Sequence, residues 1–239
     1  MNELQKRFES EVKETVKVTK RLGAGDYTAS HGGNVCYKVE ENILLITPTK
    51  FLKSEINFED IIFIDTKGKV LYAAEGRKPS GELLMYLKIF EKRLDIKSVV
   101  HAHPPVLTGI ACTNSDILSK PFIIQSVIEL GPVARVECRN PVSSDLAEAF
   151  EKVIHRADVF LMNNHGVTIC GKGSISRTMD LLELLETQAK SLLVGIQLGD
   201  LQEIPRKEIE NLEVTLKNRN LPLPGDPKYI KSLMQIYYE

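Results

Sequence analysis

Three of the five histidines in the chain lie in positions that favour a metal site. His101 and His103 are separated by one residue and follow a β-branched run. Residues i and i+2 of a strand project from the same face, so these two imidazoles are expected side by side. His165 follows a second apolar run, at 159–162. Neutral imidazole nitrogens are common zinc ligands, so the three histidines predict a zinc site; the alternative is ordinary surface or hydrogen-bonded core histidines.

A carboxylate and several groups able to hold an anion accompany these histidines. Glu82 is expected in the first turn of a helix, and Ser80 and Gly81 stand just before it, where backbone donors and the helix dipole favour negative charge. Asn34 follows two glycines, which let the backbone approach a ligand closely. Thr49 ends a strand-like run. Each residue alone most often caps a helix or closes a turn, so only their occurrence together indicates a binding site.

The composition is that of a soluble globular protein without a general affinity for nucleic acid or membranes. Of the 239 residues, 43% are hydrophobic and 26% are charged, and the formal net charge is −1. No apolar run approaches the roughly 20 residues of a membrane span, and the polar N-terminus lacks the apolar core of a signal peptide. We therefore expect a cytoplasmic protein. The cysteines form no CxxC pair and are expected to be buried free thiols: Cys36, Cys112, Cys138 and Cys170.

Hydrophobic periodicity divides the chain into amphipathic helices and short strands, and tight turns between the strands favour antiparallel pairing. Without an internal repeat or a long linker, we expect one mixed α/β domain over residues 1–239, whose tail from about residue 200 is a candidate contact with a neighbouring subunit. Helices are expected at 4–22, 83–90, 144–156 and 175–198. Strands are expected at 35–39, 43–47, 61–65, 70–73, 122–128 and 133–138, with a further pair around Leu161 and Ile169.

Five motifs, in this order, resemble the class II aldolase/adducin family of sugar-phosphate aldolases, and within it the L-fuculose-1-phosphate aldolases. The resemblance covers roughly residues 5–200. The motifs are Gly33-Asn34-Val35, Ile46-Thr47-Pro48-Thr49, Pro79-Ser80-Gly81-Glu82, Val100-His101-Ala102-His103 and Asn164-His165-Gly166.

The resemblance implies a fold, a site and a reaction. The fold is a three-layer α/β/α sandwich around a mixed, mostly antiparallel sheet, in subunits that form a homotetramer with active sites at the interfaces. One Zn²⁺ per subunit is held by His101, His103 and His165, and Glu82 is the catalytic acid/base. The substrate phosphate is held by Gly33, Asn34, Thr49, Ser80 and Gly81. The reaction is cleavage of a ketose 1-phosphate to dihydroxyacetone phosphate and an aldehyde, in which a divalent cation stabilises the enediolate.

The chain departs from the family pattern at several positions. Lys50 replaces a glycine after the phosphate-binding threonine, and Gly81 replaces a serine. Gln125 stands where the fuculose-phosphate enzymes carry an aldehyde-side tyrosine from a neighbouring subunit. The candidates for the second aldehyde-side tyrosine, which comes from the tail, are Tyr237 and Tyr238. His31, close to the glycine turn, is a further polar candidate.

Other activities within the family stay open. Sugar-phosphate dehydratases and decarboxylases share the metal and phosphate groups, so the motifs do not exclude them. Pentulose-phosphate 4-epimerases carry aspartate where Glu82 stands, which ranks that activity lower. Adducin-like domains lose the zinc histidines that this chain keeps. A zinc-bearing binding module without turnover is the remaining alternative.

Overall fold

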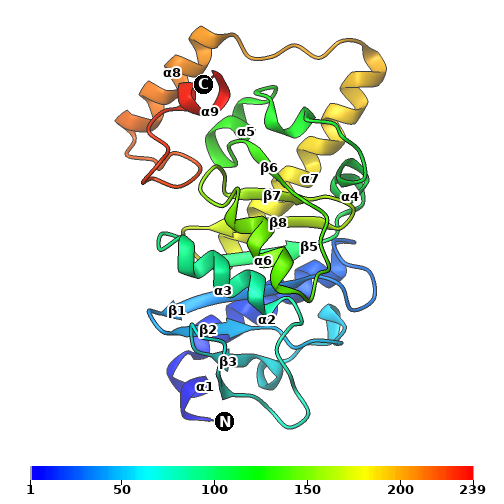
Figure 1. The fold of residues 1–239 in the computed structure, drawn as a ribbon, viewed down its shortest axis with the longest axis vertical. Coiled ribbons are helices and arrows are strands. Elements are labelled where there is room, and N and C mark those ends of the chain that lie inside the picture. Colours follow the sequence, from blue (N-terminus) through cyan, green and yellow to red (C-terminus); the bar gives the residue numbers. More distant parts are fainter. Residues whose placement is uncertain (1, 239) are drawn as a thin grey trace.

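A mixed β-sheet runs through the middle of the protein, with its strands stacked along the long axis of the molecule (Figure 1). The computed structural model of the chain describes residues 2–238. Within these residues the sheet has 8 strands in the order β4-β3-β2-β1-β5-β8-β7-β6. The strands are β1 (Asn34–Glu40), β2 (Ile43–Ile46), β3 (Ile62–Ile64), β4 (Val70–Tyr72), β5 (Ser98–Ala102), β6 (Val133–Val136), β7 (Val159–Met162) and β8 (Gly166–Gly171).

Helices cover both faces of the sheet. α3 (Leu83–Lys92) and α6 (Ser144–Glu151) pack on one face, in front of the sheet in Figure 1. α2 (Glu9–Ala24), α4 (Pro105–Ala111) and α7 (Ile175–Leu198) pack on the opposite face. The expected three-layer α/β/α sandwich is therefore confirmed. Three short 3-10 turns complete these layers: η1 (Lys53–Glu55), η2 (Phe58–Asp60) and η3 (Ile117–Ser119).

Strand β5 is buried on both faces, including its polar residues Ser98 and His101. Val100 and Ala102 belong to the core beneath α7, and Val99 belongs to the core beneath α3 and α6. Because side chains alternate along a strand, His101 lies on the same face as Val99. The imidazole of His101 is therefore directed toward the layer that contains α3.

Strand direction brings several chain segments to one edge of the sheet. Neighbouring strands are antiparallel except β6 and β7, which are parallel. Since β1 and β8 both run against β5, the start of β1, the end of β5 and the start of β8 meet. The end of β2 lies beside the start of β1. We call this edge of the sheet the site edge. Four of the five sequence motifs lie at the ends of these strands, and the fifth, the segment before α3, is attached to the same edge.

The expected strand at 122–128 is wrong, because the chain forms the helix α5 (Ile124–Glu129) there. The run is rich in β-branched residues, but only Val127 of the helix is buried and Ile124 is exposed. One buried stripe suits a helix lying on other helices, whereas a sheet would bury alternate residues. Tertiary packing outside the sheet therefore overrides the local preference.

Two smaller expectations also need correction. The opening helix is interrupted at Phe8, which has non-helical backbone angles and separates α1 (Glu3–Arg7) from α2. Of the cysteines, Cys36 and Cys170 are buried, as expected for core thiols, but Cys112 and Cys138 are exposed.

The last part of the chain forms its own apolar cluster. α8 (Arg206–Asn218) and α9 (Leu233–Tyr238) pack against α5 around the buried residues Val127, Ile209 and Leu233. Figure 1 shows this cluster beyond β6, at the end of the molecule opposite the N-terminus.

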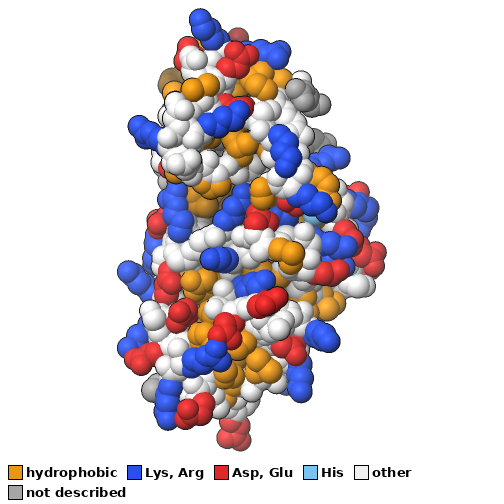
Figure 2. Space-filling model, turned by 90° about the vertical axis from the view of Figure 1, so that its left-hand side faces the viewer, with side chains coloured by type: hydrophobic (Ala, Val, Ile, Leu, Met, Phe, Trp, Pro, Cys, Tyr) orange, Lys and Arg blue, Asp and Glu red, His pale blue; other side chains and the backbone are white. Residues whose placement is uncertain are grey.

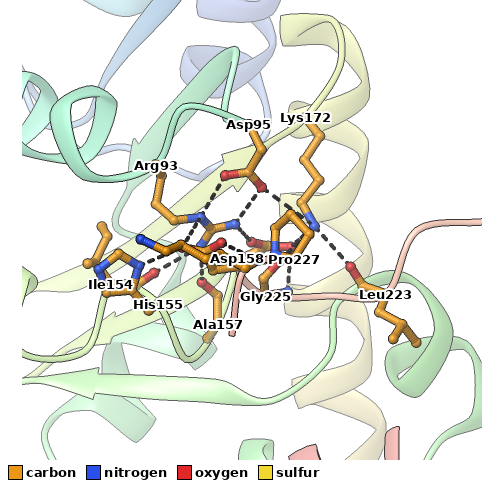
Figure 3. A network of polar contacts seen from close by, with 12 residues as sticks. Arg93, Asp95, Ile154, His155, Ala157, Asp158, Lys172, Leu223, Gly225 and Pro227 are labelled. Atoms are coloured by element: carbon orange, nitrogen blue, oxygen red, sulfur yellow. Dashed lines mark hydrogen bonds and ion pairs between the residues drawn. The ribbon is translucent and has the colours of Figure 1, made fainter. Parts of the chain in front are cut away.

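A buried polar network, which we call the tail clasp, ties the segment before α9 to the sheet (Figure 3). Its side chains are Arg93, Asp95, His155, Asp158, Lys172 and Asp226. The fully buried guanidinium of Arg93 donates to both oxygens of Asp95 at 2.8 and 2.9 Å and to Asp158 at 2.6 Å. Lys172 Nζ donates to the carbonyl oxygens of Leu223 at 2.9 Å and Gly225 at 2.8 Å. The clasp therefore joins the tail to residues that flank β5, β7 and β8.

The surface carries mixed charge. On the face drawn in Figure 2, basic and acidic side chains are interspersed, in keeping with the net charge of −1. Among the helices described, none combines the length and the apolar character that crossing a bilayer requires.

Replacing Arg93 by methionine should destabilise the protein by roughly 3–5 kcal/mol, because it removes the fully buried cation that pairs with the partly buried Asp95 and Asp158. Urea unfolding followed by circular dichroism measures this. The matched control is Arg139→Met, which removes an exposed arginine paired with exposed Glu137 and should cost less than about 1 kcal/mol. Equal effects of the two substitutions would contradict a stabilising role for the clasp.

Candidate metal centre

The three candidate metal ligands converge at the site edge. His101 is near the end of β5, His103 follows that strand directly, and His165 precedes β8. Their ring centroids are 4.8, 4.8 and 5.0 Å apart. One ligand nitrogen of each ring lies within 4.8 Å of the others, which is the spacing of a shared metal ion.

Hydrogen bonding and burial keep two of these rings in the form that binds metal. His101 Nδ1 is 3.0 Å from the carbonyl oxygen of Val167, to which it donates, so Nε2 keeps its lone pair. Burial, followed by the neighbouring His165, lowers the pKa of His101 to about 3. Burial, followed by His101, lowers the pKa of His103 to about 3. Both imidazoles are therefore neutral near pH 7.

Two glycines make room for the ring of His103. A Cβ on Gly32 would lie 2.8 Å from His103 Nδ1, and a Cβ on Gly166 would lie 2.5 Å from its Cδ2. Any side chain at either position would press on the imidazole. Gly32, which directly precedes the Gly33-Asn34-Val35 motif, and Gly166 of the Asn164-His165-Gly166 motif therefore belong to the architecture of the candidate metal site.

Glu82 completes the constellation. Its side chain is about nine-tenths buried; Oε2 is 3.4 Å from His101 Nε2, and Oε1 is 3.6 Å from His165 Nε2. Asn34 Nδ2 donates to Oε2 at 2.8 Å. Tyr86 in turn donates its hydroxyl to the side-chain and main-chain oxygens of Asn34. A chain of hydrogen bonds thus fixes the carboxylate beside the imidazoles.

The donor set fits a divalent metal ion. Three imidazole ligands leave an open coordination position for a substrate, as catalytic zinc sites do. Glu82 Oε1 is buried and has no hydrogen-bond partner among residues 2–238, which is costly unless a cation or a proton reaches it. This unpaired oxygen is a second observation, beside the three imidazoles, that fits a cation between Glu82 and the histidines.

The segments expected to hold phosphate are joined by backbone hydrogen bonds. Thr49 N donates to the carbonyl oxygen of Lys78 at 2.9 Å, and Ser80 N donates to that of Thr47 at 3.2 Å. A β-bridge between Pro48 and Pro79 lies between these two bonds. The loop after β2 and the segment before α3 are therefore held side by side at the site edge.

Three candidate residues differ in detail from the expectation. Ser80 does not cap α3, whose N-cap is Glu82; instead Ser80 Oγ accepts from Glu82 N at 3.3 Å. The side chain of Asn34 is already committed to Glu82 and Tyr86, which leaves its backbone and that of Gly33 for a phosphate. Gly81 faces Val142, since a Cβ there would lie 3.3 Å from a methyl group of that valine.

Lys50 is exposed and has a φ of 55°, in the left-handed region that favours glycine. This backbone conformation explains why a glycine would suit the position, as the family pattern given above has it. A lysine there is strained, and its ammonium is free to extend over the loop that contains Thr49.

The aldehyde-side candidates lie away from the histidines of their own chain. Tyr237 packs in the apolar cluster of α8 and α9, and burial raises the pKa of its hydroxyl. Tyr238 is partly exposed on the same helix. Gln125 is exposed on α5, where its amide donates to Glu129 at 3.1 Å. His31 is exposed, and its ring nitrogen is 3.1 Å from Ser30 Oγ.

Sequence reasoning missed two buried residues beside the site. Tyr86 lies one helical turn after Glu82, so its position on α3 was a usable signal. Lys53 is buried although it lies in a polar stretch, and only the fold reveals that its ammonium reaches the loop before Gly33.

Gly32→Ala should weaken zinc binding by about tenfold or more, because the new methyl group displaces the His103 ring. Calorimetric titration of Zn²⁺ into the metal-free protein measures the change. Gly173→Ala is the matched control, since nothing lies within 4 Å of a Cβ at that glycine. Unchanged zinc affinity in a folded Gly32→Ala protein would show that the ring has more freedom than the packing indicates.

The chain is similar to known proteins in both sequence and fold. The chain is 32% identical to an L-fuculose phosphate aldolase of Methanocaldococcus jannaschii over 77% of this chain and 96% of that protein. It is 28% identical to a 3-oxo-tetronate 4-phosphate decarboxylase of Haemophilus influenzae over 77% of this chain and 89% of that protein. A solved L-fuculose 1-phosphate aldolase superposes with a TM-score of 0.77 at 25% identity, over 87% of this chain and 96% of that one.

The family comparison covers most of the chain and includes all five motifs. Residues 13–193 match the family described as Class II Aldolase and Adducin N-terminal domain. The expected resemblance is thereby confirmed, and a histidine triad able to hold a metal ion agrees with the metal dependence of class II aldolases. The chain belongs to the class II aldolase and adducin family.

Proposed function

We propose that the protein is a zinc-dependent aldolase that cleaves a ketose 1-phosphate to dihydroxyacetone phosphate and an aldehyde. The observation that carries the proposal is the buried Glu82 carboxylate, whose Oε1 lacks a partner beside three converging imidazoles. One Zn²⁺ per subunit on His101, His103 and His165 would act as a Lewis acid for the negative charge that develops on two neighbouring substrate oxygens.

The substrate phosphate is proposed to lie against the joined loops of the site edge. Backbone amides and hydroxyl groups are suitable donors to a phosphate. These would come from Gly33, Asn34, Thr49, Ser80 and Gly81, with Lys50 adding a positive charge from the rim. A phosphate held there places the adjoining carbons of a short ketose next to Glu82.

Glu82 is the proposed acid/base residue. Retro-aldol cleavage breaks the bond between C3 and C4 of the ketose, and the C4 hydroxyl gives its proton to a base on the aldehyde side of the site as the aldehyde forms. The remaining enediolate needs a proton at C3 before dihydroxyacetone phosphate can leave. A carboxyl group fixed through Asn34 and Tyr86 can deliver or remove that proton without reorganising.

The aldehyde side is proposed to be completed by a neighbouring subunit of a homotetramer in the cytoplasm. Tyr237 and Tyr238 lie on α9, in a cluster separate from the histidines of their own chain. The domain would span residues 1–239, and its tail from about residue 200 would present one or both tyrosines to another copy.

Decarboxylation of a phosphorylated sugar acid is the second candidate. The Haemophilus influenzae relative, named a 3-oxo-tetronate 4-phosphate decarboxylase, supports it. Loss of carbon dioxide from a 3-oxo acid also leaves an enolate, so the same metal and the same proton donor would serve. The two reactions differ in the group that leaves, which is an aldehyde in one and carbon dioxide in the other. The substrate carboxylate of the decarboxylase needs a cationic contact in the site, whereas the aldehyde portion of a ketose does not.

Glu82→Gln should reduce turnover by about 100-fold or more, because the amide cannot exchange the proton. Zinc content should stay close to one per subunit, since all three histidines remain. Glu91→Gln, an exposed change on α3, is the control for both measurements. Full activity in the Glu82 variant would refute the proposed acid/base role.

A substrate panel separates the candidate reactions. Ketose 1-phosphates and phosphorylated 3-oxo acids would be incubated with the zinc-loaded enzyme, and dihydroxyacetone phosphate and carbon dioxide measured. We expect dihydroxyacetone phosphate from at least one ketose 1-phosphate and loss of that activity on complete chelation of the metal, with recovery when Zn²⁺ is restored. Activity that survives metal removal would exclude the mechanism, and carbon dioxide release alone would favour the decarboxylase.

A further inference from the structure

Lys53 is a buried cation with no paired carboxylate. Its residue exposure is 2%, and it makes no ion pair with an acidic side chain among residues 2–238. Lysines are rarely buried without a partner, because removing an ammonium from water is expensive. Either a bound anion or the groups packed around Lys53 must therefore offset the free energy of burying this charge.

The ammonium group connects two of the loops at the site edge. Nζ donates to the carbonyl oxygen of His31 at 3.0 Å and to that of Phe51 at 2.9 Å. His31 directly precedes the glycines that lead into β1, and Phe51 follows Thr49 and Lys50. These two bonds use two of the three ammonium donors, which leaves one free.

Local packing brings Lys53 to this place. η1 lies against α2 at Gly23, where a Cβ would be 2.6 Å from Ser54 N. The absence of a side chain at Gly23 lets the turn that carries Lys53 approach the helix closely.

The charge of Lys53 affects the pKa values of groups in the candidate metal centre. Burial lowers its pKa to about 8, while the carboxylate of Glu82 opposes that change. Lys53 also contributes to lowering the pKa of His101 and of His103, after burial and the neighbouring imidazoles. A largely protonated ammonium at neutral pH thus lies close to Glu82 and the histidines without contacting them.

We propose that Lys53 is a positioning residue for the substrate phosphate: it fixes the loops around Gly33 and Thr49 to each other and supplies a buried positive charge for the anion between them. The inference rests on the proposed function only in taking the substrate to be phosphorylated. A phosphate on these loops would be the missing counter-charge, and the free ammonium donor is available to it. Lys53 acts together with the loop amides and takes no part in proton transfer at the reacting carbon.

The test is calorimetric titration of inorganic phosphate into the zinc-loaded protein. Lys53→Met should raise the Kd of phosphate by about tenfold or more, as expected when a charge-assisted contact is lost. Lys53→Arg, which keeps the charge, should bind phosphate more tightly than Lys53→Met. The matched control is Lys67→Met, an exposed lysine in the turn between β3 and β4, which should leave the Kd unchanged.

Steady-state kinetics provides a readout that a purely structural role would not move. With an accepted substrate, Lys53→Met should raise KM much more than it lowers kcat, and zinc content should be unaltered. An unchanged phosphate Kd in a folded Lys53→Met protein, or a loss of kcat with unaltered KM, would overturn the proposal.

A measurement on the unsubstituted protein decides the matter if Lys53→Met does not fold. The lysine ammonium signal that disappears in Lys53→Arg should shift in the NMR spectrum when phosphate is added, and an unmoved signal overturns the proposal. Failure of the proposed aldolase is distinguishable: weaker phosphate binding in Lys53→Met without cleavage of any ketose 1-phosphate supports Lys53 and refutes the reaction. Normal cleavage with an unchanged Kd refutes Lys53 alone.

Discussion

The structure depends on the antiparallel pairing of β5 with both β1 and β8. In this register His101 lies between Asn34 and Thr168, so one row of the sheet places a candidate metal ligand beside the residue that orients Glu82. A shift of one residue would turn His101 to the opposite face, toward α7. The candidate metal centre therefore depends first on the register of these strands, and only then on which side chains they carry.

Around that row, nearly every polar group has a defined partner. The Val167 carbonyl fixes one imidazole, and Tyr86 and Asn34 fix the carboxylate. Two buried groups near the site differ from this pattern within the described residues. Glu82 Oε1 has no hydrogen-bond donor, and the ammonium of Lys53 has no acidic side chain paired with it. One suits a cation and the other an anion, which is the pairing that a metal and a phosphorylated substrate would supply.

The three-layer architecture and the shared metal site of all three histidines are expected from the resemblance to the family. Local patterns in the sequence predict neighbouring imidazoles at His101 and His103, from their i, i+2 spacing, and most of the helices and strands, from hydrophobic periodicity. The sequence also marks His165 as a third candidate by its place after an apolar run, but it has no local link to the other two. It fails at 122–128, where a β-branched run lies on helices instead of in the sheet. Lys53 and the tail clasp also escape prediction, since their partners are carbonyl groups and side chains far away in the chain. Such contacts leave no periodic trace in the sequence.

The tail clasp lies at the opposite ends of the strands from the histidines, because Asp95 and Asp158 precede β5 and β7, and Lys172 follows β8. One end of the sheet thus carries the candidate metal site, while the other end holds the C-terminal segment. Because the two groups of residues are separate, the contacts of the tail clasp can change while the three histidines keep their geometry. Substitutions in the tail clasp can therefore vary how the C-terminal segment is attached without altering the candidate metal site.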